Sequence, residues 1–475
     1  MVSDRRPVRR GGNKAPLLEI KQLMDALVVR LLRVGRLSLL FVVFAVPFPA
    51  LCAHAAQPVR PSRGTPCGHF SSYFLQPEEI SYPEPPPTRL TLMTPRWLAL
   101  QMSATGYQKS GIHLVGWDGS GFVPTEVNDD SGLDYFVPIL SSTLHLTLAQ
   151  AFDLFIAGTM TLCCAAGLVG LFLGLKSRWL KIWALVEVLS LGALWMWVGD
   201  VYVVQSAVVL LVIPWVLFFL NREHSRWHVL FFLAAGVALG LANFVRAQAG
   251  LPVLLFAICV VLLNGKYAAK RKVALLTALI VGTAAVVLFS RHAFTVRDAY
   301  LREQRRDYVP ASRQHPLWHT VYIGLGFIST PYVAGGYCDQ VGFSEAQTIS
   351  PGIRLFSPDY DHVLKSEVYN LTKAHPYVLL TNLAAKLGVL QMMALFAGNI
   401  GLLAAFLSRK LSFLDAGFFA AAACGAIPGL LAIPVPKYLE GGITVIVLYG
   451  VVRLDPSFEE NSASVPQWLR GWAAK

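Results

Sequence analysis

The chain has 475 residues, of which 55% are hydrophobic and 14% are charged. A soluble globular domain carries about 25% charged residues, so this composition excludes an ordinary soluble protein and indicates a polytopic membrane protein. The formal net charge is +12. The basic residues fall mostly in short segments between apolar runs, which is typical of membrane topology and not of nucleic-acid binding.

The N-terminal region predicts a basic cytoplasmic segment followed by a first transmembrane helix. Residues 1–36 are rich in arginine, and the apolar run 37–56 follows them. A cleavable signal peptide is the alternative, because Ala53, His54 and Ala55 resemble a small-x-small cleavage site. Both interpretations leave residue 57 outside the cytoplasm.

A long polar segment, 57–146, is predicted to form the first non-cytoplasmic loop. Its first half is rich in proline, which argues against regular structure there. Its second half contains the motif DDSGLDY at 129–135, in which three carboxylates precede the next apolar run.

Nine further apolar runs follow, and most are near the roughly 20 residues that a spanning helix needs. They are 147–175, 182–198, 203–220, 229–245, 248–264, 273–290, 377–407, 412–434 and 439–453. The run 377–407 is too long and contains Lys386, so we expect an interfacial helix and then a span at 388–407. The expected fold is all-α, with about ten transmembrane helices.

The charges between these runs predict which loops face the cytoplasm. The segments 176–181, 221–228, 266–272, 408–410 and the tail from 453 are short and basic, as cytoplasmic loops usually are. The expected organisation is helices 2–7 in 147–290, a second large loop at 291–376, helices 8–10 in 377–453 and a cytoplasmic tail at 454–475. Both large loops then lie on the non-cytoplasmic face.

Asp129 and Asp130 are the first candidate functional residues. Paired carboxylates can share a proton, so that one of them acts as a general base, or they can hold a divalent cation. The alternatives are a solvated loop, or Asp130 as the N-cap of a helix that runs into 135–145. Ionisable groups at the mouth of a membrane helix bundle favour the functional interpretation.

Asp200 and Arg246 lie in two short turns that are predicted to face outward. Asp200 is held between two apolar helices, and its alternative role is to cap the helix that starts at 203. Arginine is disfavoured in an outside turn, and guanidinium binds phosphate bidentately, so Arg246 is a candidate phosphate ligand. Its alternative role is snorkelling to lipid headgroups. Arg291 and Lys437, at other outside helix ends, can join it.

Two further features belong to the outside loops. Tyr322 is one of several aromatic residues of the second loop that can stack on a sugar ring, although an interfacial aromatic belt explains them equally well. Cys67 and Cys338 are the cysteines placed in outside loops, and an oxidising compartment permits a disulfide between them. The sequence does not show whether they meet.

The whole pattern resembles the GT-C superfamily of integral-membrane glycosyltransferases, which includes aminoarabinose transferases and protein O-mannosyltransferases. The resemblance covers most of residues 37–453. It rests on an acidic end to the first loop, an acid in the next outside turn, a later outside arginine and a basic-aromatic turn after the second large loop. These are Asp129-Asp130, Asp200, Arg246 and Pro436-Lys437-Tyr438.

The resemblance implies a polyprenyl-phosphate-linked sugar as donor, bound from the membrane lipid, and an acceptor that is a glycan, a lipid or a protein. It implies that Asp129 or Asp130 activates the acceptor hydroxyl, that Asp200 shapes the same pocket and that Arg246 binds the lipid phosphate. Any divalent metal would lie at these acids. The remaining candidates for substrate binding are Arg291, Tyr322, Lys437 and Tyr438. The expected location is the bacterial inner (plasma) membrane, with the active site on the periplasmic face.

The alternative function is a transporter or flippase for a lipid-linked or small polar substrate. Such a protein would show ionisable residues near the bilayer midplane and broken, repeat-related helices. Here the notable charges cluster at one surface and no fixed-period repeat is evident, which favours an enzyme. A non-catalytic assembly protein is a third interpretation.

Overall fold

A computed structural model describes residues 94–125, 129–220, 226–306, 308, 310, 316–333, 339–407 and 412–455. The chain divides into two units, Met1–Ser62 and Arg63–Lys475, and every described residue belongs to the second. The expected first span at 37–56 lies outside the described residues, and so do Cys67 and Cys338.

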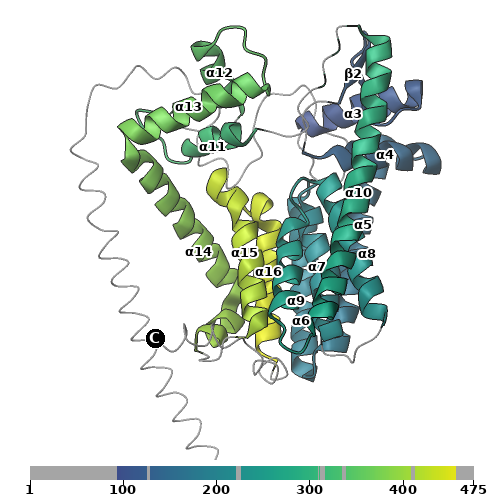
Figure 1. Cartoon of the computed structure of the whole chain (residues 1–475), viewed down its shortest axis with the longest axis vertical. Helices are drawn as coiled ribbons and strands as arrows, with labels where there is room; N and C mark the ends of the chain where they lie inside the picture. The colour runs from purple at the N-terminus through teal and green to yellow at the C-terminus, as the bar shows by residue number, and fades with distance from the viewer. Residues whose placement is uncertain are drawn as a thin grey trace, which may run out of the picture. The chain divides into compact units, whose positions relative to one another are not determined.

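The described chain is mainly helical (Figure 1). The first part consists of α3 (Thr94–Ser110), β1 (Val115–Trp117), β2 (Phe122–Pro124), α4 (Ser131–Leu144), α5 (Leu148–Gly174), α6 (Arg178–Val198), α7 (Val203–Leu220), α8 (Arg226–Val245) and α9 (Leu251–Leu263). The second part consists of α10 (Ala269–Gln304), α11 (Leu317–Leu325), α12 (Asp339–Ile349), α13 (Pro358–Ala374), α14 (Pro376–Leu407), α15 (Phe413–Leu431) and α16 (Pro436–Arg453). The two strands pair as an antiparallel hairpin.

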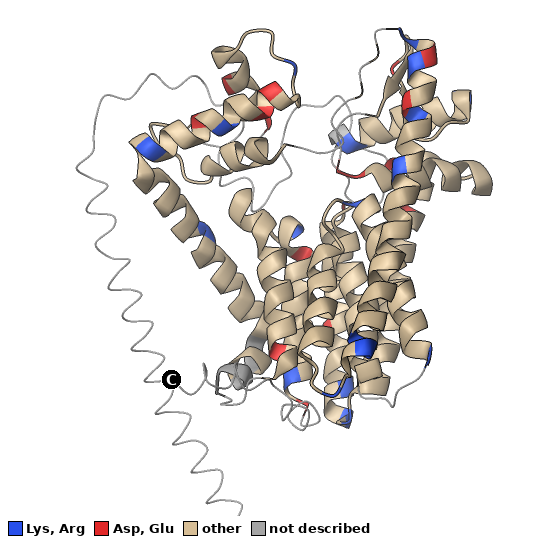
Figure 2. Cartoon of the chain, viewed as in Figure 1, with Lys and Arg blue, Asp and Glu red and all other residues tan. Residues whose placement is uncertain are grey.

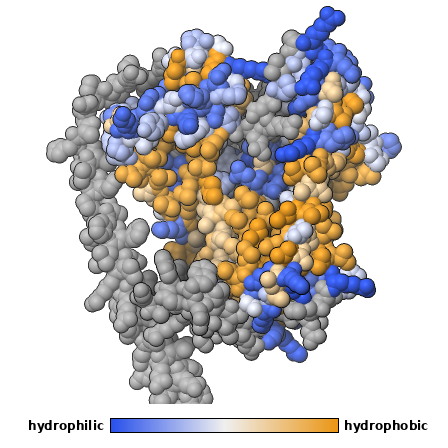
Figure 3. Space-filling model, in the orientation of Figure 1, coloured by the Kyte–Doolittle hydropathy of each residue, from blue (hydrophilic) through white to orange (hydrophobic). Residues whose placement is uncertain are grey.

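Seven of the described helices are long and apolar enough to cross a membrane. They are α5, α6, α7, α8, α10, the first 23 residues of α14, and α15. Figure 3 shows a hydrophobic band across the middle of one face, and Figure 2 shows the charged residues mainly toward the two ends of these helices. The chain is therefore a multi-pass integral membrane protein.

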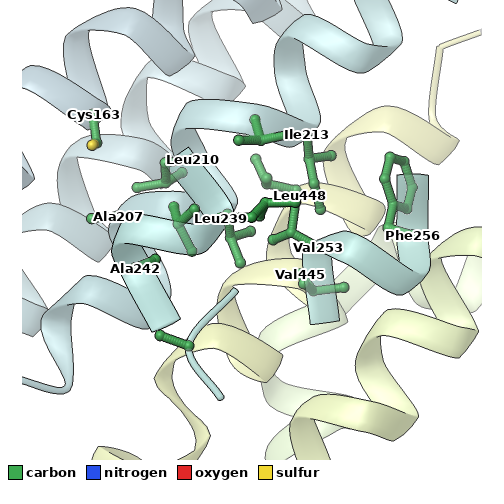
Figure 4. Close-up of a cluster of buried hydrophobic side chains, with 14 of the residues drawn as sticks. Cys163, Ala207, Leu210, Ile213, Leu239, Ala242, Val253, Phe256, Val445 and Leu448 are labelled. Carbon is green, nitrogen blue, oxygen red and sulfur yellow. The ribbon is translucent and has the colours of Figure 1, made fainter. Parts of the chain in front are cut away.

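Helix α7 lies at the centre of the main hydrophobic core, where it packs on α5, α8, α9 and α16. Its side chains Leu210 and Ile213 meet Leu239 of α8, Val253 of α9 and Leu448 of α16 (Figure 4). An apolar sequence on every face explains this position, because a helix that is hydrophobic all round is stable only when it is surrounded.

The prediction that 377–407 splits into two helices is wrong, because α14 is continuous from Pro376 to Leu407. Lys386, the reason for the expected break, is buried at 2% exposure. Its ammonium donates a hydrogen bond to the Leu430 carbonyl at 3.0 Å. Leu430 lies in the last turn of α15, where carbonyls lack helical partners, so the charge is accommodated without interrupting α14.

Both predicted large loops contain regular structure. The described part of the first loop forms α3, the β-hairpin and α4, and α4 begins at Ser131, directly after Asp130. In the second loop, α10 continues past 290 to Gln304, so the basic stretch from Arg291 extends a spanning helix. Helices α11, α12 and α13 then pack together around buried residues that include Tyr322 and Tyr360.

Candidate functional site

The acidic motif is fixed to the end of α8 by a close backbone contact. The amide of Ala247 donates a hydrogen bond to the Asp129 carbonyl at 2.7 Å. A Cβ placed on Gly132 would lie 2.7 Å from the Cα of Val245, so only glycine permits this approach of α4 to α8. The contact brings the carboxylate of Asp130 to the guanidinium of Arg246.

Gly132→Ala is expected to destabilise the protein by about 1–3 kcal/mol, because the added methyl group would push α4 away from the α8 backbone. The measurement is the thermal unfolding midpoint of the purified protein in detergent. Gly158→Ala in α5 is the matched control, since nothing lies within 4 Å of its Cβ position. Equal midpoints for the two variants would show that the close approach has no energetic importance.

The α6–α7 turn holds Asp200 in an unusual backbone conformation. Gly199 and Asp200 both have positive φ, at 69° and 68°. For a non-glycine residue this costs on the order of 1–3 kcal/mol, which the surrounding contacts must offset. One carboxylate oxygen of Asp200 accepts a hydrogen bond from the Val201 amide at 2.7 Å, and the other faces Arg96.

Two arginines bridge the acids of these segments. Arg96, in the first turn of α3, places Nε 2.5 Å from Asp130 Oδ2 and Nη1 2.6 Å from Asp200 Oδ2. Arg246 Nη1 lies 2.8 Å from Asp130 Oδ1 and 3.5 Å from Asp129 Oδ2. Three acids therefore meet two bases at one end of the helix bundle.

Tyr202 joins the two guanidiniums. Its hydroxyl accepts hydrogen bonds from Arg96 Nη2 at 3.2 Å and from Arg246 Nη2 at 2.9 Å. The same arginines lie over its ring, 4.9 Å and 4.3 Å from the centroid. Tyr438 makes an edge contact with the Tyr202 ring at 5.0 Å. We call Arg96, Asp129, Asp130, Asp200, Tyr202 and Arg246 the arginine–aspartate cluster.

The neighbouring aspartates keep both arginines of the cluster ionised. Burial alone would lower the pKa of Arg96, but Asp130 and Asp200 outweigh it and raise that pKa well above its ordinary value. Burial also lowers the pKa of Arg246, but the neighbouring charges outweigh it and the pKa rises. Asp130 is the largest cause of this rise. Burial raises the pKa of Tyr202, so its hydroxyl keeps its proton at neutral pH.

The two neighbouring aspartates have different surroundings. Asp130 occupies the N-cap position of α4, but its side chain makes no capping hydrogen bond, and both of its oxygens accept from arginines. Its side chain is 2% exposed, whereas that of Asp129 is 20% exposed. Asp129 is therefore the more accessible of the two carboxylates.

The residues of the cluster do not fit a metal ion between the carboxylates. The guanidinium of Arg96 lies between Asp130 and Asp200, where a cation ligated by both acids would have to bind. Within the described part of the chain, no group of three or more His, Cys, Asp or Glu residues is arranged to hold a metal.

The structure brings only some of the other predicted residues to the cluster. Tyr438 is in contact with it through Tyr202, and Lys437 lies beside Tyr438, with Nζ 5.4 Å from the ring centroid. Arg291 is exposed on α10, and Tyr322 is buried among α11, α12 and α13. Neither has a described contact with the cluster.

Sequence reasoning missed Arg96 and Tyr202. Arg246 was identified because it is an arginine in a predicted outside segment, and the same is true of Arg96. Other arginines of 57–146 carry the same signal, so it did not distinguish Arg96. The Tyr202 side chain follows Asp200 in the same turn, but an aromatic residue at a membrane surface usually belongs to an interfacial belt.

Comparisons with known proteins give one likeness of fold. No protein-family model and no curated protein matches the chain. ArnT from Cupriavidus metallidurans, solved in the apo state, is similar in structure, with a TM-score of 0.33 and 13% sequence identity. The likeness covers 77% of this chain and 72% of the ArnT chain. At this score and identity the likeness carries no argument.

Proposed function

We propose that the chain is a membrane glycosyltransferase that transfers a sugar from a polyprenyl-phosphate-linked donor to an acceptor on the non-cytoplasmic face. The observation that carries the proposal is the arginine–aspartate cluster. It unites the starts of α3 and α4, the α6–α7 turn and the end of α8 at one end of the bundle.

The chemistry of this transfer matches the groups present. Departure of a phosphate-linked lipid needs fixed positive charge, and the acceptor hydroxyl needs a positioned base. Arg246 supplies fixed positive charge, and its Nε is buried without a partner among the described residues. Asp129 is the acid that an acceptor can reach, while Asp130 holds the two arginines in place.

The proposed topology has about ten spans, with a cytoplasmic N-terminus and both large loops on the periplasmic face of a bacterial inner membrane. The alternation of short basic segments supports this orientation. An indirect link between the second loop and the arginine–aspartate cluster also supports it. Phe327, which follows α11, packs in one cluster with Tyr438, and Tyr438 contacts Tyr202.

The test is sugar transfer by the purified protein in liposomes. Polyprenyl phosphate carrying a radiolabelled sugar is the donor, and an envelope extract of glycans, lipids and proteins supplies the acceptor. We expect label to leave the donor and to enter another fraction, with release of unglycosylated polyprenyl phosphate. The Asp129→Asn/Asp130→Asn double variant is the control. Movement of an unchanged lipid-linked sugar across sealed liposomes, without any transfer, would instead identify a flippase.

A further inference from the structure

Glu440 is a buried carboxyl group that the proposed chemistry does not use. It lies in the second turn of α16 and is 0% exposed. Both of its carboxyl oxygens are buried without a hydrogen-bond partner among the described residues. Buried polar side chains are nearly always bonded, so this exception requires an explanation.

The position of Glu440 is set by close packing of α16 on α7. A Cβ on the neighbouring Gly441 would lie 3.1 Å from the Cβ of Gln205, so the two helices approach closely there. One turn further along α16, Thr444 shares a hydrogen bond with Ser206 at 2.8 Å and accepts one from Trp195 at 3.1 Å. The segment of α16 that carries Glu440 is therefore held against the first turns of α7.

Glu440 lies beside the segment that follows Asp200, because Tyr438 contacts the Tyr202 ring at 5.0 Å and Gly441 approaches Gln205. Helices α6, α7, α14 and α15 pack against α16, and at this end α6 and α15 carry no charged side chain. The remaining elements, including α16 itself, bring titratable or charged groups to this end. They are Asp200, Tyr202, Tyr377, Lys386, Lys437 and Tyr438. Lys386 bonds the Leu430 carbonyl, and Asp200 already pairs with Arg96.

We propose that Glu440 is a positioning residue of the arginine–aspartate cluster, which holds a proton beside Asp200 and so leaves Arg96 shared between Asp200 and Asp130. An ionised Glu440 would place a second carboxylate next to Asp200 without a second cation. Like charges in one buried site disfavour the doubly ionised state. Loss of the proton to solvent would therefore disturb the Arg96 bridge. The proposal rests on the proposed function, in which that bridge orients the reacting groups.

The first test is the pH dependence of sugar transfer. At pH values above the one at which Glu440 ionises, the transfer rate of the parent is expected to fall about tenfold per pH unit. The reason is that only the protonated form keeps Arg96 shared between Asp200 and Asp130. Glu440→Gln has the same shape and no proton to lose, so the ratio of its alkaline to its neutral rate is expected to stay near one. Glu440→Asp moves the carboxyl by one methylene, and its alkaline limb is expected to shift along the pH axis.

The second test does not depend on activity. The folded protein keeps a proton that the unfolded chain releases above about pH 4.3, so stability is expected to fall as pH rises. The thermal unfolding midpoint of the parent should drop between neutral and alkaline pH by more than that of Glu440→Gln. Thr444→Val, which removes a neighbouring buried hydrogen bond, should lower the midpoint equally at every pH.

The outcomes separate this proposal from the proposed function. If the parent and Glu440→Gln share one pH dependence of unfolding, Glu440 does not hold the proton and the proposal is overturned. If Glu440→Gln does not fold, the pH dependence of sugar transfer by Glu440→Asp decides the matter. An alkaline limb at the same pH as in the parent would overturn the proposal. If the parent transfers no sugar, the glycosyltransferase fails, while the unfolding measurements still decide the state of Glu440.

Discussion

Asp129→Asn is expected to lower sugar transfer by about 10²- to 10⁴-fold, the usual contribution of a general base. Asparagine keeps the size of the side chain and the backbone carbonyl that bonds Ala247. The contact of Asp129 with Arg246 Nη1, at 3.5 Å, is partly exposed. The unfolding midpoint should therefore stay close to that of the parent. The measurements are the initial transfer rate and the thermal unfolding curve of the same preparation.

Asp130→Asn is the comparison that makes this prediction specific. Asp130 is buried and bonded to both arginines, so its loss is expected to lower stability as well as rate. Asp359→Asn in the first turn of α13 makes the same chemical change at an exposed site and should alter neither. A parental rate for Asp129→Asn, with a lowered rate for Asp130→Asn, would transfer the role of base to Asp130.

The membrane helices were predictable because each one is encoded locally. The run 203–220 coincides with α7, and the other runs in 147–264 lie within four residues of the helices observed. Hydrophobic length alone sets these boundaries. The prediction for 377–407 is wrong because it assumed that Lys386 must leave the helix. Its partner, the Leu430 carbonyl, belongs to another helix and cannot be inferred from the local sequence.

The candidate site was predictable only in part, for a related reason. Asp129, Asp130, Asp200 and Arg246 stand out because charge is rare in an apolar chain, and the structure brings all four together. Arg96 bonds both Asp130 and Asp200. The position of Arg96 depends, however, on how α3 docks against α4. Docking between helices is a tertiary property without a local sequence signal.

The energetic cost of this arrangement supports the proposal that the cluster is a functional site and not simply a stabilising ion pair. Removing buried charges from water costs several kcal/mol per ion, so a buried salt bridge alone is weak support for stability. The Asp200 turn adds backbone strain at φ 68°. Groups held at such a cost are most often found at functional sites, where fixed orientation is what the chemistry requires.

Arg96→Met is expected to cause the largest loss of stability among the cluster variants, about 3–5 kcal/mol, because it leaves buried carboxylates without their shared cation. Asp130 would keep Arg246, but Asp200 would keep only the Val201 amide among the contacts described above. The measurement is the thermal unfolding midpoint in detergent. Arg291→Met, at an exposed position on α10, is the control and should change stability by less than about 0.5 kcal/mol.

The double variant Arg96→Met/Asp200→Asn tests the physical reason for this loss. Asparagine needs no counter-charge, so adding Asp200→Asn to Arg96→Met is expected to restore part of the lost stability, although Asp200→Asn alone should destabilise the protein. A double-mutant cycle then gives a coupling energy between the two side chains, which sit 2.6 Å apart. Strictly additive effects would show that Arg96 supports the fold through its packing on Tyr202 and not through its charge.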